Sequence, residues 1–262
     1  MGICAYCKNE EKLTKEHVMP SFVYKYMKDM GQGSSSGWNE KAQKQVGSEF
    51  VVKDVCAPCN NVVLGELDAH AKAVISEAGV FTPLFTAKTV KINYEYDLLL
   101  RWLLKIAFNS SRGSGINEGV FDKFTNLILG ENCDYSEVVI SAGLLRPHKL
   151  ELAERQKYGK VLNANKYGYV NPFFTRISWA PNTPKEFHTK QIIIGALIFH
   201  VVVFNSGVIR NDRKRLKKEY LKMCKGMTII RQNSSNTLIK QTPLSFIESM
   251  KHQVLRESQL ST

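Results

Sequence analysis

Two cysteine pairs near the N-terminus have a spacing that suits metal binding. Each pair has the form C-x-x-C, with Cys4 and Cys7 in the first and Cys56 and Cys59 in the second. A turn of this kind brings two thiolates to one side of an ion, and two turns supply the four ligands of tetrahedral zinc. A single C-x-x-C is also typical of a redox motif, but two pairs favour a structural Zn²⁺ site, which we expect here.

An acidic residue and a histidine stand side by side between the cysteine pairs, in "TKEHVMP". These are Glu16 and His17, and Asn60 directly follows the last cysteine of the second pair. Glutamate and asparagine oxygens suit a hard divalent cation, and a neutral imidazole can take a proton from water near pH 7. Zinc would hold the two segments together without taking part in chemistry. Taken alone, Glu16 and His17 also fit an exposed strand end.

The order C-x-x-C, E-H-x-x-P, C-x-x-C-N-N resembles the HNH (ββα-metal) endonuclease family, in its branch with two zinc knuckles. The resemblance covers about the first third of the chain. It implies that Glu16 and Asn60 bind catalytic Mg²⁺ or Mn²⁺ and that His17 is the general base. It also implies hydrolysis to 5′-phosphate and 3′-hydroxyl products. In that family a further asparagine supports the histidine, and "GSEFVVKDVC" contains none.

The expected function is therefore that of a metal-dependent endonuclease acting on nucleic acid, DNA in preference to RNA. Chains of this two-part kind resemble bacterial or phage nucleases of restriction or antiphage defence. The alternative is a zinc-containing nucleic-acid-binding protein without catalytic activity. The presence of Glu16, His17 and Asn60 together favours the enzyme.

The local patterns predict the elements that position these residues. "SFVYKYM" predicts a helical turn, "SEFVVKDVC" a strand, and "GQGSSSG" a flexible loop. From Asn60 to Gly79 the period is helical, with Asn60 near the N-terminus and the glycine at the end. One apolar face is formed by Val63, Leu64, Leu67, Ala71, Val74 and Ile75.

The remaining two thirds predict a mixture of helices and strands. An amphipathic helix over "YEYDLLLRWLLKIAFNSSRGSG" should end at Gly113, and "FDKFTNLILGE" predicts another. Residues 137–204 are mostly β in pattern, and the tail from Asn233 is polar. We predict an α+β fold with two domains. Residues 1–88 form a zinc-held HNH module, and residues 89–262 form a basic domain of helices and antiparallel sheet.

Charge is divided unevenly along the 262 residues, whose formal net charge is +12. Residues 1–88 are neutral overall, so the excess lies in residues 89–262 and favours an anionic partner there. We predict phosphate contacts by a basic helix, with a solvated surface as the alternative. A protein partner or a second copy at this domain is also open. The predicted nucleic-acid-binding residues are Arg210, Arg213, Lys214, Arg215, Lys217 and Lys218.

The sequence also predicts a soluble, cytoplasmic protein that does not bind a membrane. The N-terminus lacks the pattern of a signal peptide, and the most apolar run, residues 192–204, is too short to span a bilayer. In that compartment the six cysteines are not expected to form structural disulfides. Asp68 and His70 lie on the helix after Asn60, where a solvated face is favoured and an approach to the site is the alternative. His148, His188, His200 and His252 are predicted to be structural.

Overall fold

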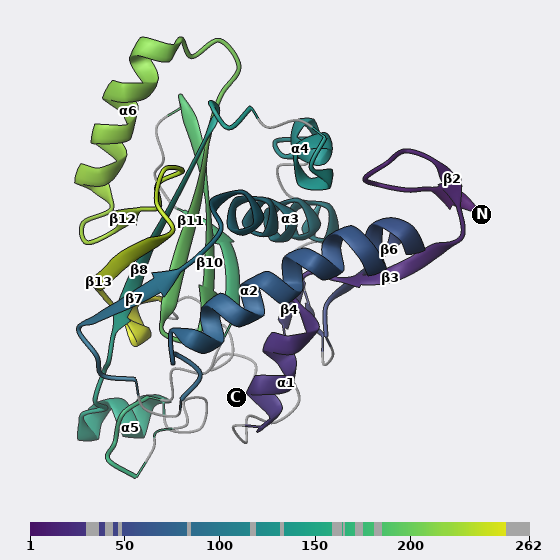
Figure 1. Ribbon diagram of the computed structural model, residues 1–262. Coiled ribbons are helices and arrows are strands. Elements are labelled where there is room, and N and C mark those ends of the chain that lie inside the picture. The colour runs from purple at the N-terminus through teal and green to yellow at the C-terminus, as the bar shows by residue number, and fades with distance from the viewer. Residues whose placement is uncertain are drawn as a thin grey trace.

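A mixed β-sheet lies at the centre of the molecule, with helices packed on both faces (Figure 1). Its strand order is β7-β13-β8-β11-β10-β9, and β12 pairs with β8 outside this path. The computed structural model describes residues 1–29, 37–39, 44–46, 49–82, 85–115, 119–131, 134–158, 164, 166–170, 175–180 and 185–249. The sheet strands are β7 (Thr89–Asn93), β8 (Val138–Arg146), β9 (Thr175–Trp179), β10 (Phe187–Ile194), β11 (Leu197–Phe204), β12 (Thr228–Ile229) and β13 (Asn236–Ser245).

Both faces of the central strands are covered, which explains the long apolar run in the sequence. The run folds as the hairpin β10–β11, turning at Gly195, where φ is +56°. Every residue of β11 is buried. Val201 and Val203 belong to the main core on the side of α3 (Tyr96–Ser114), whereas Val202 packs with α6 (Arg210–Met223) on the other side. Strands buried on both faces show continuous rather than alternating hydrophobicity.

The sheet is not purely antiparallel, which corrects the predicted architecture. β13 runs antiparallel to β7 but parallel to β8, with Gln241 opposite Leu144. The polar tail from Asn233 therefore contains a sheet strand. Its side chains alternate between exposed and buried, so the segment lacks the continuous apolar run of β11. Residues 246–249, the last described residues, make one helical turn.

Helix α3 extends beyond its predicted end because of one glycine. The helix ends with Gly115 in the left-handed region, at φ +66°, and not at Gly113. A Cβ atom on Gly113 would come within 2.7 Å of the Phe50 ring, so this glycine permits close packing of α3 on the N-terminal hairpin. The next predicted helix is a 3-10 turn, η2 (Asp122–Phe124), followed by α4 (Thr125–Leu129).

The N-terminal part contains a pair of antiparallel strands and a helix that follows the second of them. β3 (Leu13–His17) pairs with β6 (Val51–Cys56), and a π-helical turn, η1 (Cys59–Leu64), continues into α2 (Gly65–Glu77). Five of the six residues predicted for the apolar helix face are buried; Val63 is half-buried. The remaining elements are β1 (Gly2–Ile3), β2 (Glu10–Glu11), α1 (Ser21–Asp29), β4 (Gly37–Asn39), β5 (Lys44–Val46) and α5 (Leu152–Tyr158).

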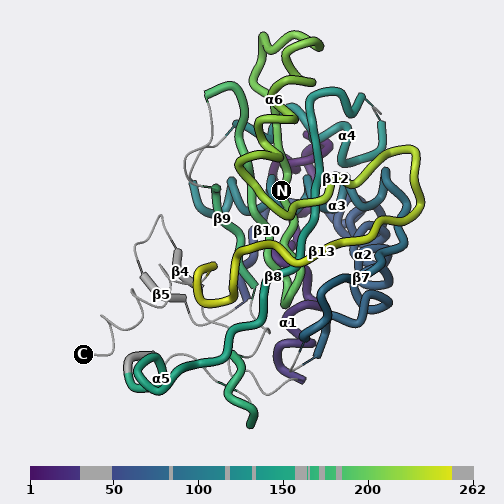
Figure 2. The backbone as a smooth tube through the Cα atoms, turned by 90° about the vertical axis from the view of Figure 1, so that its left-hand side faces the viewer, coloured from purple at the N-terminus to yellow at the C-terminus, as the bar shows by residue number. Residues whose placement is uncertain are grey.

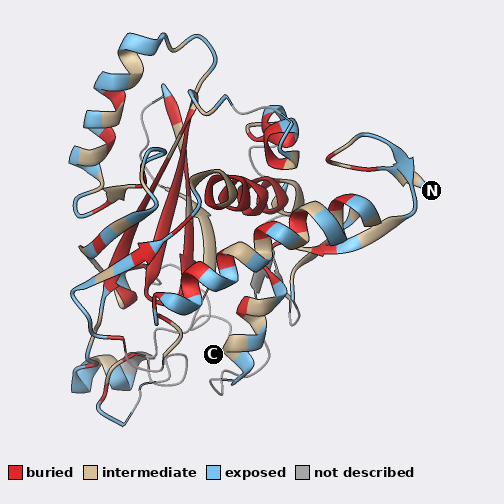
Figure 3. Cartoon of the chain, in the orientation of Figure 1, coloured by how far each residue is buried: buried red, intermediate tan, exposed pale blue. Residues whose placement is uncertain are grey.

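One continuous core joins the two predicted domains. Buried side chains run from α2 through α3 into the sheet (Figure 3). The proposed boundary at residue 88 falls between α2 and β7, yet α2 packs along α3. Figure 2 shows α6 and α5 at opposite ends of the sheet. Among the described helices, none is long and apolar enough to cross a bilayer.

Candidate functional site

The four cysteines of the two C-x-x-C pairs come together in a single cluster. Their sulfur atoms all lie within 4.8 Å of one another, and three of the four residues are buried. The Cys56 N–H donates to Cys4 Sγ at 3.4 Å, which ties the two turns to each other. Four sulfurs at this spacing are compatible with a structural zinc ion, as the sequence predicted.

The pKa values of these thiols differ within the cluster. Burial alone would raise the pKa of Cys4, but N–H donors from Cys56 and Cys7 lower it to about 7. Burial and the neighbouring sulfurs raise the pKa of Cys59. Buried thiolates repel one another unless a metal ion balances their charge, so binding and deprotonation are linked.

The antiparallel pairing of β3 with β6 determines the direction in which the Glu16 and His17 side chains point. Successive strand residues point to opposite faces, and here Glu16 is 5% exposed while His17 is half-buried. The pairing shifts between Thr14 and Glu16, where β6 has one extra residue. A bulge of this kind increases local twist and is common beside active sites.

Asn60 is hydrogen-bonded to the strand that carries the other two predicted residues. Its Nδ2 donates to Thr14 Oγ1 at 2.8 Å and to the Lys15 carbonyl at 2.9 Å. Thr14 and Glu16 lie on the same face of β3, so Asn60 is on the side of the glutamate. Asn60 lies inside the π-helical turn, which no side chain caps. Both amide hydrogens are used, which leaves Oδ1 as an acceptor.

Glu16 has a partner that the sequence analysis missed. Lys105 Nζ, fully buried on α3, lies 2.7 Å from Glu16 Oε1, and Asn109 Nδ2 donates to the same oxygen at 3.4 Å. Burial raises the pKa of Glu16, and the Lys105 charge acts against that rise. The glutamate is therefore held by a helix outside the predicted HNH module.

Asp68 completes this buried ionic cluster. Lys105 Nζ donates to both Asp68 carboxylate oxygens at 2.8 Å, and Trp102 Nε1 donates to one of them at 3.0 Å. The prediction that Asp68 faces solvent is wrong, because α2 packs against α3 at this point. His70 lies apart from the cluster and accepts a hydrogen bond from the Glu95 N–H at 3.3 Å.

His17 is supported by a carboxylate where the sequence analysis sought an asparagine. His17 Nε2 and Glu49 Oε2 are 2.6 Å apart. An ionised carboxylate only accepts, so Nε2 donates and Nδ1 keeps a lone pair. Asn109 Nδ2 also donates to the His17 carbonyl at 3.4 Å. The register of β3 with β6 places Val51, two residues after Glu49, opposite His17, and no local sequence pattern pointed to Glu49.

The two residues predicted to bind the catalytic metal each keep an oxygen atom that accepts no hydrogen bond from the described part of the chain. Two carboxylates, Glu16 and Asp68, face one ammonium, Lys105, so the cluster keeps a net negative charge. Among the described residues, Glu16 Oε2 and Asn60 Oδ1 have no hydrogen-bond donor. Carboxylate and amide oxygens with retained waters are typical of a Mg²⁺ site.

The basic residues of α6 do not share one environment. Arg213 donates to Ser136 at 2.9 Å, and Arg215 to Glu219 at 3.2 Å, so both are engaged within the protein. Lys214 and Lys218 are exposed. Arg210 and Lys217 line a pocket. Nucleic-acid binding by this helix stays a prediction.

Comparisons with protein-family models, with curated proteins and with solved structures found no match to this chain. The functional argument therefore depends on the sequence motif and on the contacts described above.

Proposed function

We propose that the protein is a metal-dependent HNH endonuclease that hydrolyses phosphodiester bonds, with DNA as the expected substrate. The observation that carries the proposal is the pair of hydrogen bonds from Asn60 to the strand of Glu16 and His17, beside the cysteine cluster. These three residues are the ones that the family motif assigns to metal binding and proton transfer. From the same resemblance, we propose a role in restriction or antiphage defence.

His17 acts as the general base in this proposal. Its Nδ1 accepts a proton from the attacking water, and Glu49 on Nε2 orients the ring and stabilises the imidazolium that results. The Asn109 bond to the His17 carbonyl fixes the end of β3. Glu16 and His17 point to opposite faces of β3. The proposed metal ligand therefore lies on one face of the strand and the proposed base on the other.

Glu16 and Asn60 would hold Mg²⁺ or Mn²⁺ through their remaining oxygens. Such an ion stabilises the charge that develops on the phosphate and on the departing 3′-oxygen. Lys105 and Asn109 fix the orientation of Glu16, and zinc at the four cysteines would keep η1 against β3. The basic surface of residues 89–262 would attract the polyanionic substrate.

One observation favours the alternative of a non-catalytic, zinc-containing nucleic-acid-binding protein. Lys105 already binds Glu16 and Asp68, so an ammonium provides part of the positive charge that a divalent ion would supply. In that case the protein binds nucleic acid with no dependence on Mg²⁺ or Mn²⁺.

A cleavage assay on plasmid DNA and on RNA, with and without Mg²⁺ or Mn²⁺, separates the two functions. We expect metal-dependent cutting by the wild type, loss of cutting in His17→Ala, and retained cutting in His188→Ala, a matched change on the distant strand β10. Zinc content and thermal unfolding should be the same in all three proteins. Binding without any cutting by the folded wild type supports the non-catalytic alternative instead.

A further inference from the structure

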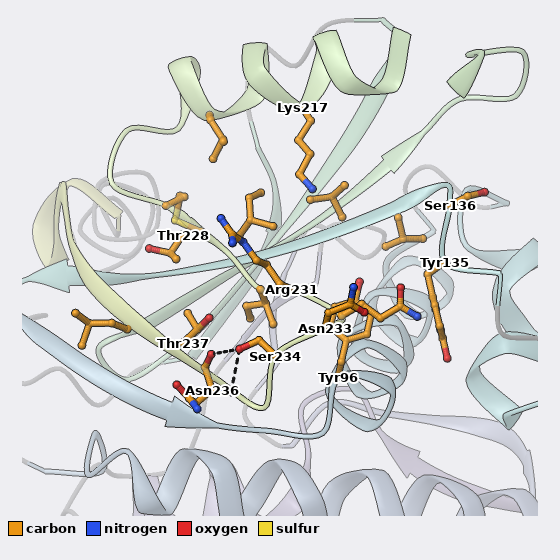
Figure 4. Close-up of a pocket in the computed structure, with 18 of the residues that line it drawn as sticks. Tyr96, Tyr135, Ser136, Lys217, Thr228, Arg231, Asn233, Ser234, Asn236 and Thr237 are labelled. Atoms are coloured by element: carbon orange, nitrogen blue, oxygen red, sulfur yellow. Dashed lines mark hydrogen bonds between the residues drawn. The ribbon is translucent and has the colours of Figure 1, made fainter. Parts of the chain in front are cut away.

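A pocket of about 1250 Å³ lies between α6, the segment from β12 to β13, and the start of α3 (Figure 4). It is separate from the Glu16–His17 site, because Tyr96 at the first turn of α3 lines the pocket while Lys105 and Asn109 further along α3 contact Glu16. None of the residues assigned to catalysis lines it. Nothing in the proposed nuclease mechanism uses this pocket.

Three basic side chains line this pocket. Lys217 extends from α6 toward Arg231, as Figure 4 shows, and Arg210 also lines the pocket. Among the described residues, no carboxylate forms an ion pair with any of the three. Burial and the Arg231 charge lower the pKa of Lys217. A bound anion would remove the repulsion between these charges and supply acceptors for their hydrogens.

One carboxylate also lines the pocket, and it does not balance these charges. Asp134 accepts a hydrogen bond from the Ser136 N–H at 2.9 Å, and this bond lowers the pKa of Asp134. A single carboxylate does not offset the three cations Arg210, Lys217 and Arg231 that line the same pocket. The pocket therefore keeps an excess of positive charge.

The rest of the lining suits an organic ring with polar substituents. The Tyr96 and Tyr135 rings meet edge to face with centroids 5.7 Å apart, and Leu221 and Ile229 add apolar surface. On the β13 side, Asn233 supplies an amide group, whereas the hydroxyl groups of Ser234 and Thr237 are hydrogen-bonded to Asn236 and Tyr94 (Figure 4). A pocket with aromatic and apolar walls and a few convergent polar groups is typical of a small-molecule site.

We propose that this pocket binds a nucleotide, with its phosphates on Lys217 and Arg231 and its base and sugar against the tyrosine and asparagine side. Arginine and lysine are the usual phosphate ligands in proteins, and an aromatic wall suits a base. Lys217 is half-buried between α6 and the sheet, whereas Lys214 and Lys218 are exposed. A nucleic-acid duplex would reach these outer lysines before it reached Lys217.

Calorimetric titration of the full-length protein tests this proposal. The probes are the four ribonucleoside diphosphates, inorganic pyrophosphate, and a short DNA duplex. We expect at least one diphosphate to bind more tightly than pyrophosphate. Lys217→Met and Arg231→Gln should each weaken its binding by about tenfold or more, because each removes a charged hydrogen-bond donor to phosphate. Lys222→Met, the same change at an exposed α6 residue outside the pocket, should leave the affinity unchanged.

Three results would overturn the nucleotide assignment. The first is no binding of any diphosphate at millimolar concentration by the folded wild type. The second is equal affinity for pyrophosphate and every diphosphate, which would make the pocket a simple anion site. The third is a loss of duplex binding in Lys217→Met with diphosphate binding unchanged. Thermal unfolding of each variant excludes a loss of folding as the cause.

Discussion

Lys105 is the residue that connects the predicted catalytic strand with the rest of the protein. Its fully buried ammonium lies between Glu16 and Asp68, which come from β3 and α2. Charges removed from water need close partners, and loss of one partner leaves the others buried without compensation. The contribution of Lys105 to folding is therefore large, whatever the catalytic role of Glu16.

Replacing Lys105 with methionine should lower the free energy of unfolding by about 3–5 kcal/mol, because two carboxylates lose their cation. Urea unfolding measures this change. Lys91→Met, at an exposed position of β7, is the control and should change stability by about 0.5 kcal/mol or less. The double variant Glu16→Gln with Lys105→Met should recover part of the loss. A loss in Lys105→Met as small as in the control would contradict this account.

His200 should control part of the acid sensitivity of the fold. Its Nε2 accepts from Gln191 at 3.1 Å and its Nδ1 donates to Tyr220 at 2.9 Å, under α6. Burial lowers the pKa of His200 from 6.5 to about 4. The unfolded chain therefore takes up this proton first as pH falls. Stability present above pH 6.5 is lost toward pH 4, by about 3 kcal/mol in total.

His200→Gln should flatten this dependence, because glutamine does not titrate. The measurement is the free energy of unfolding in urea at several pH values between 6.5 and 4. The variant is expected to be less stable than the wild type at neutral pH and to approach it at acid pH. Parallel pH profiles for the two proteins would show that His200 does not contribute.

Removal of one cysteine of the cluster should release zinc. Cys56→Ser takes away one of four sulfurs that lie within 4.8 Å of one another, and the remaining three cannot complete a closed tetrahedral site. We expect one zinc per wild-type chain by elemental analysis and none in the variant, with a lower thermal midpoint. Cys224→Ser, at a half-buried thiol outside the cluster, should keep its zinc. Equal zinc content in both variants would reject the site.

At the level of elements, the sequence predicted those helices and strands whose signals lie within one short segment. The β6 strand, the helix after Cys59 and the basic helix α6 are all present, because period and end signals lie within each segment. The partners of Glu16 were not predictable in this way. Lys105 is distant in sequence, and its position in an amphipathic helix gives no sign that it points at β3. β13 was missed because polar and apolar residues are mixed along it, with only Ile239, Thr242 and Ser245 buried.

The environment of α6 predicts which of its basic residues would contribute to the proposed DNA binding. Lys214 and Lys218 are exposed, whereas Arg213 is engaged with Ser136 and Glu137. The double change Lys214→Ala with Lys218→Ala should weaken DNA binding. It should also reduce the slope of log affinity against log salt by about 0.9 for each phosphate that the protein no longer neutralises. Arg213→Ala should mainly lower the thermal midpoint. An unchanged salt slope in the double variant would exclude α6 as the DNA surface.

At the scale of the whole molecule, the continuous core predicts cooperative unfolding. Buried side chains extend without a break from the cysteine cluster through α3 to the sheet. Urea should therefore cause one transition, with zinc release and loss of far-ultraviolet circular dichroism at the same midpoint. Zinc release at a clearly lower urea concentration would instead mark residues 1–88 as a separately folding unit.

The position of α3 limits which segment of this protein could be fused to another domain and still keep the proposed site. A gene fusion that joined residues 1–88 to another domain would carry the metal-binding motif but leave behind Lys105 and Asn109, which hold Glu16 and the end of β3. It would also expose the apolar side of α2 that packs on α3. Any transferable unit of the proposed nuclease must therefore include at least α3, up to Ser114, and is larger than the motif alone indicates.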